Sequence, residues 1–189
     1  MNLSENWLPR HRLTVEEYHR MGETGVLAPD ARVELIEGEI IDMAPIGSRH
    51  ASVVNRLNDL LTLAVRGRAI VQVQGPVRLS DRSEPEPDLA LLKPRADYYR
   101  DALPTAADVL LVIEVADSTQ RYDRTVKAPL YARHGISELW VVDLENALVH
   151  VYRRPESDTY ADTSATDRPG ATSIAALAGV SVDLSGVLR

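Results

Sequence analysis

The sequence contains no cysteine and no phenylalanine among its 189 residues. Without cysteine, disulfide bonds and thiolate zinc sites are excluded. Without phenylalanine, the hydrophobic core has to rest on Leu, Val, Ile and Ala. No apolar run approaches the roughly 18 residues of a membrane span, and the N-terminus lacks the basic flank and apolar core of a secretion signal. These features lead us to expect a cytoplasmic protein with no membrane partner.

An excess of basic residues is also missing, since the net charge is −7. Proteins that hold nucleic acid through phosphate contacts alone are usually basic. Any contact with DNA would therefore need local basic patches, bound metal, or both. The chain also has no G-x-S-x-G, P-loop, H-E-x-x-H or G-x-G-x-x-G motif, which leaves the hydrolases and nucleotide-binding enzymes that carry these motifs with little support.

The length and the composition, 44% hydrophobic and 26% charged, are typical of one soluble globular domain over residues 1–189. Residues 1–11 are expected to form a loose arm. The polar segment 153–173 is expected to be either poorly ordered or an exposed hairpin. Residues 174–188 carry enough apolar side chains to dock back onto the domain.

Local patterns predict alternating helices and strands, and hence an α/β or α+β fold with a mixed sheet. A capping box starting at Thr14 predicts a helix that ends near Met21 and Gly22, and Ser48 is expected to cap a second helix that ends at Gly67. A third helix should end at Gly135, with Pro129 kinking it or lying in its first turn. The predicted strands are 32–36 and 39–43 (a hairpin), 69–73 resuming at 77–79, 87–92, 109–115, 137–143 and 147–152.

Two of these strands bring carboxylates to apolar surroundings. Asp88 opens the run 87–92, and Glu114 lies near the end of the run 109–115. Burying an unpaired carboxylate is unfavourable, so Glu114 needs either a partner or a chemical role. Lys127 follows in a polar segment. The two acids and this lysine predict an oxygen-ligand metal site with a cation beside it.

Each of these residues also has a simpler explanation. Glu114 is also compatible with a structural ion pair to an arginine or to Lys127, although this is the less favoured interpretation. Asp88, after a proline, is of the type that forms a turn, and Lys127 of the type that lies solvated on a helix. Asp123 fits a helix cap better than a metal ligand.

Two further polar residues have ordinary explanations when each is taken alone. Glu34 alternates with Val33 and Leu35, so it points to the opposite face, where a solvated side chain is expected. His50 lies in the first turn of a helix, where histidine is more often a surface or capping residue than a ligand. His50 and Asp123 therefore form a second tier of site candidates.

Several sequence blocks, taken in order, resemble one known family. They are Arg32-Val33-Glu34-Leu35-Ile36-Glu37-Gly38-Glu39-Ile40, His50 at the head of the next helix, Pro87-Asp88-Leu89-Ala90, Ile113-Glu114-Val115-Ala116-Asp117-Ser118, Asp123-Arg124-Thr125-Val126-Lys127, and Tyr131 to Asp143. This set is similar to the Uma-type restriction-endonuclease family, formerly a domain of unknown function, within the PD-(D/E)XK nuclease superfamily. The resemblance covers residues 12–152.

The resemblance implies a restriction-endonuclease-like core: a central mixed β-sheet flanked by helices, with Mg²⁺ or Mn²⁺ at the edge of the sheet. Asp88 and Glu114 match the acids that bind the metal, and Glu34 matches an additional N-terminal acid. The superfamily has a lysine two positions after Glu114, where this chain has Ala116. In this family the lysine is displaced to the next helix, which assigns its role to Lys127.

The implied function is a metal-dependent endonuclease that hydrolyses DNA and works as a homodimer to cut both strands. The alternative is an inactive member of the same fold that binds nucleic acid or a protein partner. Two observations motivate the alternative, namely the acidic net charge and Ala116 in the usual lysine position.

Overall fold

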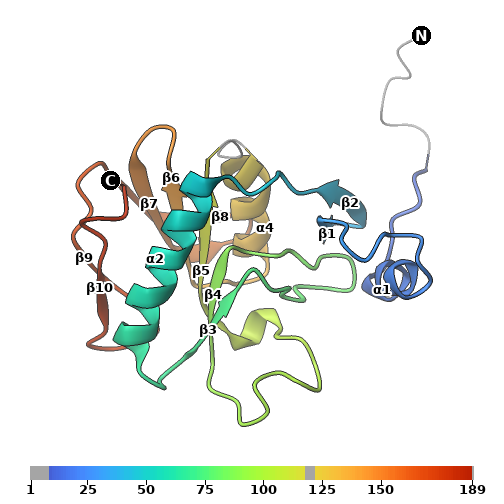
Figure 1. Ribbon diagram of the computed structural model, residues 1–189, viewed down its shortest axis with the longest axis horizontal. Coiled ribbons are helices and arrows are strands. Elements are labelled where there is room, and N and C mark those ends of the chain that lie inside the picture. Colours follow the sequence, from blue (N-terminus) through green and yellow to red (C-terminus); the bar gives the residue numbers. More distant parts are fainter. Residues whose placement is uncertain (1–8, 118–121, 189) are drawn as a thin grey trace.

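A six-stranded mixed sheet, with strand order β3-β4-β5-β6-β7-β8, forms the centre of the molecule (Figure 1). The computed structural model describes residues 9–117 and 122–188. β5 and β6 pair in parallel, and the other neighbouring strands of this sheet pair antiparallel. The predicted mixed sheet is therefore confirmed. Its strands are β3 Ile70–Val73, β4 Leu89–Leu92, β5 Val109–Ala116, β6 Glu138–Asp143, β7 Leu148–Glu156 and β8 Thr159–Thr166.

The two faces of the sheet are covered by different helices. α2, Ser48–Val65, packs on one face, where its Leu57 and Leu61 join Ile113 of β5 in one hydrophobic cluster. α4, Ala128–Arg133, packs on the other face, where a second cluster contains Tyr131 and Val112. Because side chains alternate along a strand, β5 supplies both clusters and is buried along almost its whole length.

A smaller N-terminal unit lies beside this core (Figure 1). It consists of α1, Val15–Glu23, and the hairpin of β1, Val33–Ile36, and β2, Glu39–Asp42. The predicted capping box is present, with the Thr14 and Glu17 side chains bonded to each other's backbone N–H groups. The helix continues to Glu23 rather than stopping near Met21.

The C-terminal segment returns to the core, as predicted. β9, Ala171–Ser173, and β10, Ser181–Asp183, form a two-stranded ribbon, and Ile174, Leu184 and Val187 are buried against the α2 side of the sheet. Most of the polar segment 153–173 belongs to the β7–β8 hairpin, whose β8 strand is largely exposed. Of the two expectations for that segment, the exposed hairpin is correct.

Some local predictions were wrong. Ser48 is the first residue of α2, and the N-cap position is Gly47, which has no capping side chain. Residues 77–79 do not resume a strand; Arg78 makes only an isolated bridge to Thr105. The break is sharp because Gln74 adopts a positive φ of 46° immediately before Gly75 and Pro76.

The third predicted helix starts unusually. A π turn, η2, spans Asp123–Lys127, and α4 follows it with Pro129 in its first turn. A short 3₁₀ turn, η1, spans Ala106–Asp108.

Most of the predicted arm 1–11, and part of the turn predicted after Asp117, lie outside the described residues. Within the described ranges, no helix combines the length and apolar character needed to cross a bilayer.

A candidate active site at the ends of β4 and β5

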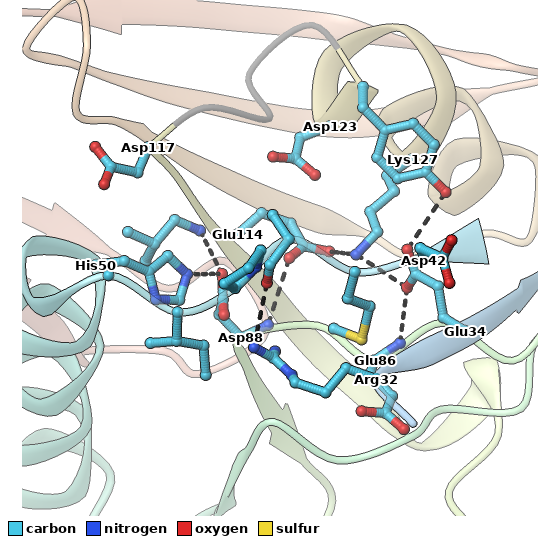
Figure 2. A pocket seen from close by; sticks show the side chains of 17 residues that line it. Arg32, Glu34, Asp42, His50, Glu86, Asp88, Glu114, Asp117, Asp123 and Lys127 are labelled. Atoms are coloured by element: carbon cyan, nitrogen blue, oxygen red, sulfur yellow. Dashed lines mark hydrogen bonds and ion pairs between the residues drawn. The ribbon is translucent and has the colours of Figure 1, made fainter. Parts of the chain in front are cut away.

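The antiparallel pairing of β4 with β5 brings the two predicted metal ligands together. Leu89 lies opposite Ile113, so Asp88, just before β4, reaches the level of Glu114. The backbone N–H of Asp88 donates to Oε2 of Glu114 over 3.4 Å. Both carboxylates line one cavity of about 170 Å³ between the sheet and the N-terminal hairpin (Figure 2). The structure therefore places the two predicted metal ligands side by side at one cavity.

Glu114 is held by two donors on a single oxygen. Oε1 accepts from the Lys127 ammonium at 3.1 Å and from the Tyr131 hydroxyl at 2.7 Å. Lys127 and Tyr131 are four residues apart and project from the same side of the helical segment, as helical spacing requires. Glu114 itself is 3% exposed. One carboxylate oxygen is thereby fixed, and the other faces Asp88.

Lys127 joins the N-terminal hairpin to the sheet. Its ammonium lies 3.1 Å from Oε2 of Glu34 as well as 3.1 Å from Glu114, and both acids are buried. Glu34 also accepts from the backbone N–H of Glu86 and from the Tyr122 hydroxyl. The backbone supports this arrangement through the π turn, in which Ala128 N–H bonds to Asp123 O; such turns occur often at functional sites.

Asp88 is positioned by backbone and histidine contacts. Its Oδ2 accepts from Val115 N–H at 2.8 Å and lies 3.0 Å from Nε2 of His50. This hydrogen bond raises the pKa of His50, although partial burial opposes the shift. His50 Nδ1 is buried and finds no partner among the described residues. The first turn of α2 thus supports the carboxylate at the start of β4.

The electrostatic surroundings favour protonation of Glu114 when no metal is bound. Burial raises the pKa of Glu114 to about 8; Lys127 opposes this shift, while Asp123, Asp88 and Glu34 add to it. The opposite logic applies to Lys127, whose pKa is raised by Glu114 and Glu34 despite its burial. A positive charge on Lys127 therefore persists in a cavity that is otherwise crowded with acids.

Asp88 and Glu114 each bring to this cavity a carboxylate oxygen of the kind that binds hard divalent cations. From the residues that the structure describes, Asp88 Oδ1 receives only a 3.4 Å contact from Gln74, and Glu114 Oε2 receives only the 3.4 Å contact from Asp88 N–H. Both are long for hydrogen bonds, so each acid keeps one weakly engaged oxygen. Among the described residues, no group of three or more potential ligands is arranged around one point. Mg²⁺ commonly takes one or two carboxylates and completes its shell with water and substrate phosphate.

The structure corrects several simpler explanations of these residues. Glu34 and Lys127 are 2% and 4% exposed, so neither is solvated. His50 is bonded to Asp88 rather than lying on the surface. Asp123 is the first residue of the π turn and lines the cavity. The N-cap position, which the sequence assigned to Asp123, is occupied by Tyr122.

Some neighbours of these acids were not predicted as site residues. Tyr131 bonds to Glu114, and its spacing of four residues from Lys127 was an available signal. Tyr122 and Glu86 contact Glu34. Their participation depends on the N-terminal hairpin packing over the sheet, and no local sequence signal indicates that packing.

Comparison with known proteins agrees with this fold. The model of the Uma2 family, described as "Putative restriction endonuclease", matches residues 15–185. A crystal structure of a "putative nuclease belonging to DUF820" from Anabaena variabilis ATCC 29413 superposes with a TM-score of 0.73 at 18% sequence identity. That alignment covers 93% of this chain and 97% of the other, which establishes a shared fold. No curated protein matches this chain.

Proposed function

Since this chain belongs to the Uma2 family of restriction-endonuclease-like proteins, we propose that it is a divalent-metal-dependent endonuclease that hydrolyses DNA phosphodiester bonds. One observation supports the proposal above others. Asp88 and Glu114 come from adjacent strands, each with one oxygen anchored and one weakly engaged, beside a buried lysine. This is an arrangement that presents hard oxygen ligands and a cation to a phosphate.

The chain's own residues have distinct roles in this proposal. Asp88 Oδ1 and Glu114 Oε2 would hold Mg²⁺ or Mn²⁺, which would polarise a phosphodiester oxygen and lower the pKa of a bound water. Lys127 keeps a positive charge next to the reacting phosphate, where negative charge develops. Glu34 and Tyr131 position Lys127 and Glu114, and His50 positions Asp88. Ala116, in the usual lysine position, is buried in the core, so Lys127 takes over that role from the helix.

A direct test is plasmid nicking in Mg²⁺ or Mn²⁺ by the wild-type protein and by Glu114→Gln. We expect wild type to convert supercoiled plasmid to open circles, and Glu114→Gln to lower the rate on the order of a thousandfold, because a charged metal ligand is lost. Glu156→Gln, the same change on an exposed residue of β7, should leave nicking unchanged.

Binding of Mn²⁺ by titration calorimetry separates this proposal from the alternative of a non-catalytic nucleic-acid- or protein-binding module. An active nuclease should bind Mn²⁺ through Asp88 and Glu114 and lose that binding in Glu114→Gln. Nicking that persists in Glu114→Gln would contradict the proposed site. Plasmid binding without Mn²⁺ binding would favour the non-catalytic module.

We also propose that the active species is a homodimer in the cytoplasm, because cutting both DNA strands is simplest with two copies of one site. Sedimentation velocity should then give the mass of two chains. A monomer that nevertheless makes double-strand breaks would contradict this part of the proposal.

A further inference from the structure

The cavity carries a charge problem for any phosphate substrate. Seven of its lining side chains are carboxylates, and two, Arg32 and Lys127, are permanent cations. One divalent ion does not offset that imbalance, and a DNA strand adds one negative charge per nucleotide. A phosphate substrate therefore depends on a cation of the cavity that is not already engaged by its carboxylates.

Lys127 is already engaged by Glu34 and Glu114. Arg49, next to His50, donates to the Leu144 carbonyl and pairs with Asp117 at 3.6 Å. Arg32 differs from both, because it makes no ion pair with any residue that the structure describes. Its guanidinium makes one hydrogen bond, from Nη1 to the Ala44 carbonyl at 3.2 Å.

The hairpin positions Arg32 at the cavity. Arg32 and Glu34 are two residues apart on an extended segment, so they point to the same face, and both line the cavity. The backbone carbonyl of Arg32 accepts from Met43 N–H at 2.9 Å, which extends the β1–β2 pairing by one step. Glu34 is buried at the inner end of this face, whereas Arg32 is exposed.

In Figure 2 the Arg32 side chain extends from beside Glu86 toward Asp88. Its charge also acts on Glu86: burial and Glu34 raise the pKa of Glu86, and Arg32 opposes that shift. Arginine suits a phosphate at such a position because its planar group can donate two parallel hydrogen bonds to one phosphate.

We propose that Arg32 binds a backbone phosphate of the substrate strand next to the scissile phosphodiester. The inference rests on the proposed nuclease function and adds the residue that holds the strand in register. Arg32 is a phosphate-binding residue here, and the reaction itself remains with Asp88, Glu114 and Lys127. Its hydrogen bond to Ala44 keeps the guanidinium extended before the substrate arrives.

The test measures DNA binding separately from cleavage. Fluorescence anisotropy with a labelled 20-base-pair duplex in Ca²⁺ would compare wild type, Arg32→Gln, Arg32→Lys and Arg20→Gln over a range of NaCl concentrations. Arg20, on the exposed side of α1, gives the same change in net charge away from the cavity. We expect Arg32→Gln to weaken binding on the order of tenfold and to reduce the slope of log Kd against log salt by about one. Arg32→Lys should restore most of that slope.

The outcomes distinguish this inference from the proposed function. Equal affinities and equal salt slopes for Arg32→Gln and Arg20→Gln, in a protein whose wild type nicks plasmid, would overturn the role of Arg32 alone. A wild-type protein that neither nicks plasmid nor binds the duplex would overturn the nuclease function and this inference with it. Circular dichroism melting of each variant confirms that a change in binding is not a change in folding.

Discussion

Two buried glutamates, on neighbouring strands of one sheet, have opposite surroundings. Glu114 lies near the end of β5 on the α4 side, and Glu138 lies at the start of β6 and bonds to the Trp140 indole. Both are almost inaccessible, with 3% and 0% exposure. Burial alone therefore does not distinguish the proposed metal ligand from a structural acid.

The difference lies in how completely each carboxylate is hydrogen-bonded. Glu138 Oε1 accepts from Trp140 at 2.9 Å and from Arg153 at 2.8 Å, and its Oε2 accepts from the backbone N–H of Ala175 at 2.7 Å. These contacts tie β6, β7 and the C-terminal segment together. Glu114 Oε2 faces a cavity and receives only a long contact, of 3.4 Å, from the described part of the chain. A saturated buried acid stabilises the fold, whereas an unsaturated one facing a cavity is available for chemistry.

The largest expected effect concerns stability. Glu138→Gln should lower the free energy of unfolding by about 3–5 kcal/mol, because every partner of Glu138 is a donor and an amide NH₂ cannot satisfy them all. Glu114→Gln should change it by less than about 1 kcal/mol at about pH 4.5, where the amide replaces a carboxyl that is already neutral in the folded state and its oxygen still accepts from Lys127 and Tyr131. Urea unfolding of the two variants measures both values.

In the nicking assay the ranking of the two variants should reverse, so that Glu114→Gln has the larger effect and Glu138→Gln the smaller. Glu138→Gln, assayed well below its melting temperature, should retain nicking within about threefold of wild type per folded molecule. Glu138 does not line the cavity, and it lies three positions from Val141, the residue of β6 that pairs with Glu114. Similar losses of stability in the two variants would remove the distinction between a structural and a functional glutamate.

Much of the fold follows from local patterns. The capping box at Thr14 and the strands at 89–92 and 109–116 depend on residues within a few positions of one another. Glu114 was also identifiable, because a carboxylate in a continuous apolar run requires a partner or a role. The resemblance then selected Asp88 and Lys127, which local patterns left ambiguous.

The partners of Glu34 and His50 could not be predicted from the sequence, because they depend on packing between segments that are far apart in the chain. The alternating pattern of the strand predicts that Glu34 lies on the face opposite Val33 and Leu35. It does not indicate which residues pack over the face that carries Glu34. The cover is Lys127, more than 90 residues further along the chain, held there by a π turn that periodicity does not predict. His50 is similar, since its contact with Asp88 exists only after α2 packs on the sheet.

A further prediction concerns the pH dependence of stability, which should differ between wild type and Glu114→Gln. The pKa of Glu114 is raised by burial from an ordinary 4.5 to about 8, so the folded state holds a proton that the unfolded chain releases. The resulting stability is fully present below about pH 4.5 and is lost as pH rises toward about 8, with a slope of up to about 1.4 kcal/mol per pH unit. Urea unfolding of metal-free wild type and Glu114→Gln across this range should show the difference.

The variant should lack this component of the slope, and Glu156→Gln, on the exposed end of β7, should keep it. Parallel pH profiles for wild type and Glu114→Gln would mean that Glu114 is ionised throughout, with Lys127 dominating its surroundings. In that case the site would be an ordinary buried ion pair in the absence of metal.

The smallest expected effect comes from removing the hydroxyl of a buried tyrosine. Comparing two such tyrosines separates a role in positioning Glu114 from a role in stabilising the core. Tyr131 and Tyr160 both pack in the cluster on the α4 side, and both donate a buried hydrogen bond, to Glu114 at 2.7 Å and to the Ile136 carbonyl at 2.9 Å. Tyr131→Phe and Tyr160→Phe should each lower the free energy of unfolding by about 1–3 kcal/mol, because one buried acceptor loses its donor. Only Tyr131→Phe should also slow nicking, by about tenfold, since Glu114 then keeps a single anchor on Oε1. Equal nicking rates for the two variants would show that Lys127 alone suffices to orient Glu114.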